Sequence, residues 1–119
     1  MATFTKAKLS GSTDGLAILV TTIATPGDLI HTAVAGTTAG TFDEIWLWVY
    51  NHHSADLVLT IEFGGVTSPN NNIVVSVPYK AGLVPVLPGM ILQNGLVVRA
   101  FSASANLITL TGFVNQIRP

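Results

Sequence analysis

The sequence DEIWLWVYNHHSADLVLTIEF, residues 43–63, decides the fold class of this chain. In its second half, apolar residues occupy every second position: Leu57, Leu59, Ile61 and Phe63. This period of two is that of a β-strand with one buried face. It predicts that Glu62 points away from the core and meets a lysine, an arginine or water.

The first half of the same stretch has two apolar faces. Ile45, Leu47 and Val49 alternate with three aromatic residues, Trp46, Trp48 and Tyr50. Such a strand is typical of a central position, covered on both sides by a second layer or by another subunit. We therefore predict two long strands here, joined by a polar turn around His52 and His53.

The rest of the chain reads as short strands separated by turns. Strands are predicted at residues 16–22, 29–34, 73–77, 90–93, 96–101 and 107–117. Asn94-Gly95 predicts a tight hairpin between two of them, with positive φ at both turn residues. Residues 80–89 contain Pro85 and Pro88, which are typical of an edge or crossing segment because proline cannot donate to a central ladder.

No stretch shows a sustained helical period. About eight strands at this spacing predict an all-β fold, a single antiparallel β-sandwich of the jelly-roll type, with an open β-barrel as the alternative. We expect residues 1–10 to form an extended N-terminal arm and residues 11–119 to form the sandwich domain.

Composition limits the function classes. Hydrophobic residues make up 49% of the chain and charged residues only 9%, against about a quarter in an ordinary soluble domain, so we expect some apolar surface to face other protein. Five basic and six acidic residues nearly cancel, which gives no electrostatic footprint for nucleic acid. Cysteine is absent, which excludes disulfides and thiolate chemistry. We expect neither a signal peptide nor a membrane span.

Few residues suggest a chemical site. His52, His53 and Asp56 could be drawn as a metal site, but neighbouring strand residues point to opposite faces, so we favour a solvated loop. Asp28 and His31 could resemble an acid-oriented base, yet no nucleophile motif accompanies them.

Further polar and glycine-rich motifs are interpreted as structural. Asp43-Glu44 is interpreted as a solvated strand start, since adjacent carboxylates diverge and cannot face each other across a cleft. Residues 11–15 and Gly64-Gly65 lack the strand-to-helix context of a phosphate loop, which makes them turns. Tyr79-Lys80 and Arg99 are isolated, and only a role in contacts between subunits is assigned to them.

The three aromatic residues of the first strand allow two readings. Trp46, Trp48 and Tyr50 could form a platform that stacks on sugar rings, as in carbohydrate-binding modules. The reading that we favour is that they lie in the core or at a subunit interface, because the opposite face of the strand must pack as well.

As a whole, the chain resembles the capsid decoration, or cement, proteins of tailed bacteriophages. The resemblance covers roughly residues 4 to 118 and is carried by turn and strand motifs: PGDLIHTA at 26–33, AGT at 35–37, DEIWL at 43–47, LTIEFGG at 59–65, LPG at 87–89, Leu92, NGLVVRAF at 94–101 and GFVN at 112–115. It implies a non-enzymatic protein without cofactor, made in the host cytoplasm and placed on the outer capsid surface of the virion.

The resemblance also implies partners. Such proteins commonly form trimers at threefold or quasi-threefold positions, where they bind the major capsid protein between capsomers; nucleic acid, membrane and small-molecule substrates are not expected as partners. An extended arm can add to a neighbour's sheet edge, so we predict capsid contacts for Phe4, Lys6, Lys8 and Leu9. Trp46, Trp48 and Tyr50 are predicted to form a subunit interface. The alternative is a carbohydrate-binding or receptor-binding module of a phage tail or fibre.

Overall fold

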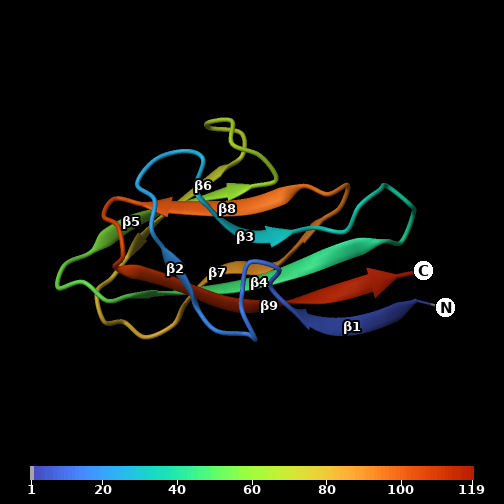
Figure 1. Cartoon of the computed structure of the whole chain (residues 1–119), viewed down its shortest axis with the longest axis horizontal. Helices are drawn as coiled ribbons and strands as arrows, with labels where there is room; N and C mark the ends of the chain where they lie inside the picture. Colours follow the sequence, from blue (N-terminus) through green and yellow to red (C-terminus); the bar gives the residue numbers. More distant parts are fainter. Residues whose placement is uncertain (1) are drawn as a thin grey trace.

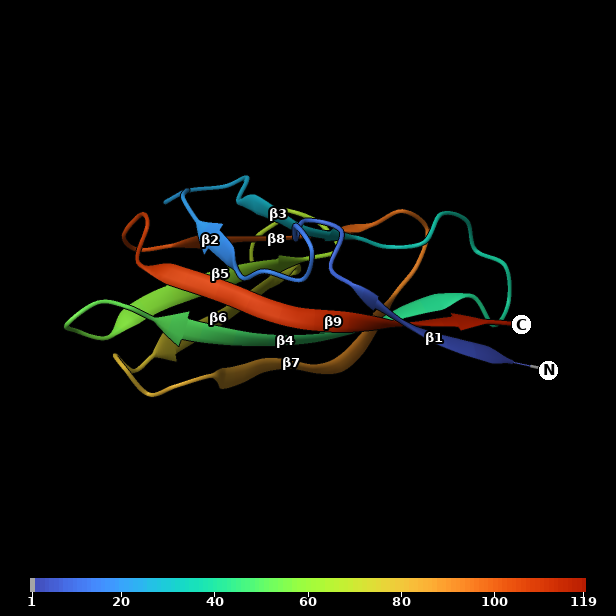
Figure 2. The same cartoon turned by 60° about the horizontal axis from the view of Figure 1, so that its bottom comes forward.

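The computed structural model describes residues 2–119, which form two antiparallel sheets packed face to face (Figures 1 and 2). The strands among these residues are β1 (Thr3–Lys8), β2 (Ile18–Val20), β3 (Asp28–Thr32), β4 (Phe42–Asn51), β5 (Leu57–Phe63), β6 (Asn72–Val77), β7 (Val84–Leu92), β8 (Val97–Ser102) and β9 (Ile108–Arg118). No helix occurs between residues 2 and 119. The predicted all-β sandwich is therefore confirmed, and the open-barrel alternative is wrong because the strands form two separate sheets instead of one curved sheet.

The strand order is that of a jelly roll. The first sheet has the order β1-β9-β4-β7, with β2 also paired to β9, and the second sheet has the order β3-β8-β5-β6. Apart from the β1–β2 and β5–β6 connections, the chain crosses from one sheet to the other at each step, which is how a jelly roll interleaves its two Greek keys.

The core lies between the sheets and follows the predicted alternation. On β4, Ile45, Leu47 and Val49 point inward and are fully buried. They pack in one hydrophobic cluster with inward residues of β5, such as Leu59 and Ile61. The second apolar set of β4, the aromatic one, consequently points outward.

The N-terminal segment is paired along the first sheet, so the expected extended arm is not confirmed. β1 runs antiparallel to the last part of β9, from Thr3 opposite Arg118 to Lys8 opposite Phe113. Leu9, which was expected to contact a capsid, is only 1% exposed and belongs to the core. The chain turns inward directly after β1, and this turn carries Leu9 between the sheets.

The Asn94-Gly95 turn is confirmed in its backbone angles but not in its hairpin. Both residues have positive φ, 64° and 67°. The strands that they join separate, because β7 pairs with β4 and β8 pairs with β5 and β3. The amides of Asn94 and Gly95 donate to the carbonyls of Gly36 and Val34, so the turn is held by a loop between the sheets. Prediction of a two-stranded hairpin at this place was wrong.

Residues 80–89 fulfil the edge prediction. Residues 84–89 are the first part of β7, which lies at the edge of the first sheet, and the register of β7 against β4 shifts next to Pro85 and Pro88. The predicted strand at 90–93 is the end of this longer strand. With β1 added, the described residues contain nine strands where about eight were expected.

Candidate binding face

The aromatic residues of β4 lie outside the core, on the outer surface of the first sheet. Trp46, Trp48 and Tyr50 are half-buried, whereas the residues between them are fully buried. Of the readings left open by the sequence, core packing is therefore wrong for these side chains. A subunit interface and a ligand platform remain compatible with this position.

Trp46, Trp48 and Tyr50 form a row along β4, and Phe113 of β9 lies beside the two indoles. Its ring centroid lies 6.2 Å from that of Trp46 and 5.9 Å from that of Trp48, and the two indole centroids are 6.4 Å apart. The ring planes of each pair lie within 29° of parallel. Sequence reasoning missed Phe113. It follows Thr109 and Thr111 at intervals of two and shares their outward side of β9, whereas Leu110 points to the core. We call Trp46, Trp48, Tyr50 and Phe113, with the outward residues of β1, the aromatic face.

β1 adds basic and apolar side chains to the aromatic face. Residues directly opposite each other in antiparallel strands share a side of the sheet, and Lys8 stands opposite Phe113. Lys6 and Phe4 alternate with Lys8 and thus lie on the same side. The ammonium nitrogen of Lys6 lies 4.4 Å from the Phe113 ring centroid, a cation–π contact of about 0.5–1 kcal/mol at an exposed site. Phe4 is 71% exposed.

The structure thus gathers six of the seven predicted contact residues on one surface. Phe4, Lys6 and Lys8 arrive from β1, and the three aromatic residues arrive from β4. The exception is the buried Leu9. No spacing in the sequence links the two groups, since β9 connects them through its register with both strands.

Glu44 fixes one end of the aromatic row. The Trp46 indole N–H donates to Glu44 Oε1 at 2.7 Å, and the Asn115 amide donates to the same oxygen at 2.9 Å. These two hydrogen bonds, the one from Asn115 first, hold the pKa of Glu44 below its ordinary value. A shallow pocket of about 200 Å³ adjoins this carboxylate, lined by Phe4, Glu44, Asn115 and Ile117. The hydrogen bond from the indole N–H to Glu44 holds the Trp46 ring in one orientation.

The other end of the row is formed by Tyr50 and His52. Their rings meet edge to face with centroids 4.4 Å apart, and His52 Nε2 lies 3.0 Å from the Thr109 hydroxyl. Asp56, which the sequence grouped with His52 and His53 as a conceivable metal site, accepts a hydrogen bond from the Tyr79 amide. Among residues 2–119 there is no group of three or more side chains placed to hold a metal ion.

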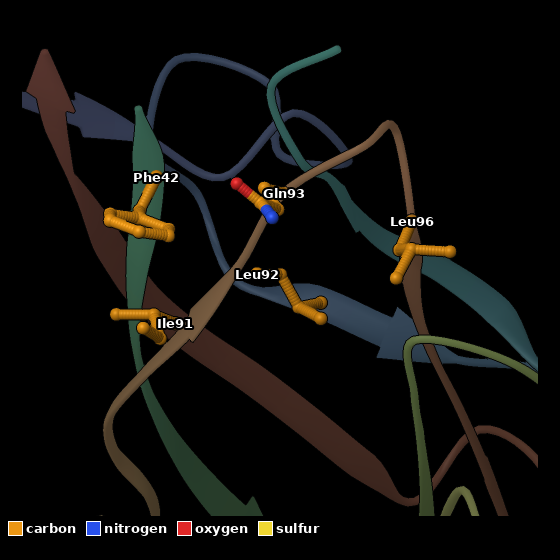
Figure 3. A pocket seen from close by; sticks show the side chains of 5 residues that line it. All are labelled: Phe42, Ile91, Leu92, Gln93 and Leu96. Atoms are coloured by element: carbon orange, nitrogen blue, oxygen red, sulfur yellow. The ribbon is translucent and has the colours of Figure 1, made fainter. Parts of the chain in front are cut away.

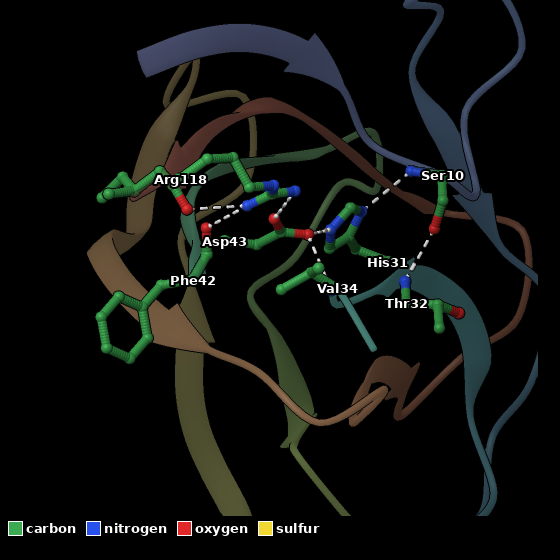
Figure 4. Close-up of polar contacts among 8 residues, drawn as sticks. Ser10, His31, Thr32, Val34, Phe42, Asp43 and Arg118 are labelled. Atoms are coloured by element: carbon green, nitrogen blue, oxygen red, sulfur yellow. Dashed lines mark hydrogen bonds and ion pairs between the residues drawn. The ribbon is translucent and has the colours of Figure 1, made fainter. Parts of the chain in front are cut away.

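A buried polar network joins β3, the start of β4 and the end of β9 (Figure 4). His31 Nε2 is 2.8 Å from Asp43 Oδ2, and Arg118 Nη2 is 3.2 Å from Asp43 Oδ1. The Val34 amide donates to the same carboxylate. Asp43 is only 2% exposed, so its interpretation as a solvated strand start was wrong: it belongs to the inward set of β4. The Asp43 carboxylate forms an ion pair with Arg118 at the end of β9.

His31 is paired with Asp43 and not with Asp28, so the arrangement that Asp28 and His31 could have resembled does not form. Asp28 accepts hydrogen bonds from the amide and hydroxyl of Thr21. Ser10 completes a set of residue types known from hydrolases, but its amide donates to His31 Nδ1 and its hydroxyl accepts from the Thr32 amide. The imidazole therefore does not activate the Ser10 hydroxyl, and the network joins chain segments instead.

Glu62 also differs from expectation. It points to the outer side of the second sheet, yet it is 1% exposed because the loop before β3 covers it. Its carboxylate accepts hydrogen bonds from the Thr25 hydroxyl at 2.5 Å and from the Gly27 amide at 2.6 Å, and not from a lysine or an arginine. A Cβ on Gly27 would lie 2.3 Å from the carbonyl oxygen of Ala100, so only glycine fits where this loop crosses β8.

A second, apolar pocket lies beside the Asn94-Gly95 turn (Figure 3). Its lining residues are Phe42, Ile91, Leu92, Gln93 and Leu96. Ile91 and Leu96 are exposed. The pocket holds no charged side chain, which gives it no evident chemistry beyond apolar contact.

In the part of the chain that the structure describes, no helix has the length and hydropathy needed to cross a bilayer. Comparison of the sequence with models of protein families and with curated proteins, and of the fold with solved structures, found no match.

Proposed function

We propose that this chain is a non-enzymatic structural protein of a tailed-phage virion. In this proposal it is made in the host cytoplasm and decorates the outer capsid surface, where it binds the major capsid protein between capsomers as a trimer at threefold or quasi-threefold sites. Two lines support the proposal: the resemblance of the turn and strand motifs, and the aromatic face. The single observation that carries it is the gathering of six predicted contact residues on that face.

The aromatic face has the composition of a protein-binding surface. Tryptophan and tyrosine dominate the binding energy of many interfaces because they bury large areas at little cost in side-chain entropy. Here the two indoles are already ordered by stacking and, for Trp46, by Glu44. Binding would therefore lose little further freedom, which favours affinity.

The two parts of the aromatic face suggest a division of roles. Phe4, Lys6 and Lys8 lie on the edge strand β1 and are exposed, so they can reach a capsid subunit. Trp46, Trp48 and Tyr50 lie on the central strand β4, where a flat neighbouring surface can cover them. We assign the first group to capsid contacts and the second to contacts between copies.

The proposed mechanism is mechanical. Packaged DNA pushes the shell outward, and burial of apolar area across capsomer joints opposes separation by about 25 cal/mol per Å² before ordering costs. Each site is weak by itself. A shell offers many sites, and a trimer engages several at once, which multiplies the effect.

The test is co-sedimentation with heads of a tailed phage from which the decoration protein has been stripped. Wild-type protein is expected to saturate the heads at a fixed number of copies per shell. Trp48→Ala removes a contact between copies, on which the multivalent binding of the trimer depends, and should weaken binding to heads by roughly thirtyfold, as expected for about 2 kcal/mol. Leu16→Ala is the matched control, because Leu16 is exposed in a loop before β2 and outside the aromatic face. Absence of wild-type binding, or equal binding of Trp48→Ala, would refute the proposal.

A carbohydrate-binding or receptor-binding module is the second candidate. The near-parallel rings of Trp46, Trp48 and Phe113 favour it, because flat aromatic rings can stack on sugar rings. Titration with glycans while tryptophan fluorescence is recorded distinguishes the two. Saturable quenching by a glycan, together with no binding to heads, would replace the capsid role by this one.

A further inference from the structure

Most sheet edges of this fold carry a feature that prevents pairing with another strand. β1 presents Lys6 and Lys8, and β2 is only three residues long. β7 contains two prolines with register shifts beside them. β3 has a register shift after Leu29 and is covered where the Gly11 amide donates to the Ile30 carbonyl. Charges, prolines, bulges and short length are the common means by which proteins block edges.

β6 has none of these features. Its sequence, NIVVSV, contains no charge and no proline, and its register against β5 is continuous from Asn72 to Val77. It forms the outer edge of the second sheet (Figure 1). Val74 is 64% exposed and Ser76 is exposed as well.

The backbone of β6 leaves hydrogen-bonding groups directed outward. The Phe63 amide donates to the Asn71 carbonyl, which marks this pair as hydrogen-bonded. In an antiparallel ladder such pairs alternate, so Ile73 and Val75 bond to β5, whereas the N–H and C=O groups of Val74 and Ser76 point away from it. Among the described residues, no turn, loop or side-chain hydrogen bond engages these groups.

We propose that β6 pairs with β6 of a second copy of this chain, antiparallel about a twofold axis through Val74. In this register Val74 exchanges backbone hydrogen bonds with Val74 of the second copy. The Ser76 amide of each copy donates to the Asn72 carbonyl of the other. The second sheets of the two copies thereby become one continuous sheet.

The properties of β6 indicate that its pairing partner is β6 of a second copy. An uncharged strand meets no repulsion from its own copy, and twofold pairing places its open groups opposite identical open groups. If the β6 edge could pair with a strand of another protein, it could also pair with β6 of a second copy of this chain. Val58, exposed on the neighbouring strand β5 and opposite Ser76, extends the apolar surface beside the joint.

The dimer should be weak. Pairing of one short strand falls at the low end of specific interfaces, below about 1,200 Å² in total. We therefore expect association that depends on protein concentration. This inference does not rest on the capsid role, and it uses a surface separate from the aromatic face.

Sedimentation velocity from low micromolar to near millimolar concentration tests the inference. Wild-type protein is expected to shift from monomer to dimer, or to dimers of its assembly unit. Val74→Lys places like charges on the axis and should abolish this shift, whereas Leu83→Lys, at an equally exposed position outside β6, should leave it unchanged. Wild-type protein without such a shift, or an undiminished shift in Val74→Lys, would overturn the proposal.

A cross-linking experiment keeps the proposal testable if Val74→Lys does not fold. The chain contains no cysteine, so a single Val74→Cys substitution reports only its own neighbourhood. A short bifunctional thiol reagent should join two copies of Val74→Cys but not two copies of Leu83→Cys. Equal cross-linking of both variants, or none in either, contradicts pairing at β6. A Trp48→Ala variant that loses head binding but still cross-links through Val74→Cys would separate this dimer from the capsid contact.

Discussion

Removal of the Asp43 carboxylate should be among the most damaging single changes in this fold. Asp43→Ala takes away the acceptor for His31 Nε2, the Val34 amide and Arg118 Nη2. Arg118 is partly exposed and can turn to water. His31 is almost fully buried and the Val34 amide is held in place by the chain, so both would lack an acceptor.

The magnitude follows from these losses. A buried donor without a partner costs about 1–3 kcal/mol, and two such donors remain, His31 Nε2–H and the Val34 amide. We therefore expect Asp43→Ala to lower the free energy of unfolding by about 4 kcal/mol. For a domain of this size, about 1 kcal/mol corresponds to about 4 °C, which gives a fall in Tm of about 15 °C.

The assay is urea and thermal unfolding followed by far-UV circular dichroism. Asp43→Asn keeps the volume but turns one oxygen into a donor that faces other donors, so it should lose about half as much stability. Asp28→Ala is the matched control, because this half-buried carboxylate bonds only to Thr21 and should lose about 1 kcal/mol. An Asp43→Ala variant within about 1 kcal/mol of wild type would show that the network is not needed for stability.

Two further predictions concern single positions of the first sheet. Gly112→Ala should destabilise the fold by about 3 kcal/mol or more, measured by urea unfolding, because its Cβ would lie 2.0 Å from the Trp46 carbonyl oxygen. Gly82→Ala, where nothing lies within 4 Å, should lose only about 1 kcal/mol from its positive φ, and equal losses would contradict the crowding argument. Because its pKa is lowered in the folded state, Glu44 should contribute stability above pH 4.5, its ordinary pKa, and lose it as pH falls through the lower folded value. Tryptophan emission should report this step below pH 4.5, and a step that persists in Glu44→Gln would exclude Glu44 as its cause.

The sequence was sufficient for fold class because strand periodicity is local. Alternation along residues 57–63 can be recognised from the local sequence alone: Leu57, Leu59 and Ile61 are buried as predicted, and Phe63 is partly buried against the core. β4 was ambiguous, because both of its faces are apolar. The two faces differ in what covers them: β5 and β8 pack against the aliphatic face, whereas residues 2–119 supply no layer over the aromatic face.

The sequence was insufficient wherever a residue meets a partner far along the chain. Asn94-Gly95 fixed two backbone angles, but turn angles do not determine which strands pair beyond the turn. His31 and Arg118 lie 12 and 75 residues from Asp43, with no spacing rule to connect them. Such contacts are set by the packing of the two sheets, which local patterns do not encode.

The N-terminal segment shows why extension alone does not establish an arm. β9 is eleven residues long, and β2 pairs only with residues 108–110 of it, so a stretch of its edge is left for another strand. β1 fills that stretch from 113 to 118. Thr5, on the opposite side of β1 from Lys6, is exposed too, so the second sheet does not cover this strand. The proposed capsid-contact residues are therefore presented on a paired strand and not on a loose tail. Binding through a paired strand orders fewer backbone torsions, which lowers the entropic cost of each capsid contact.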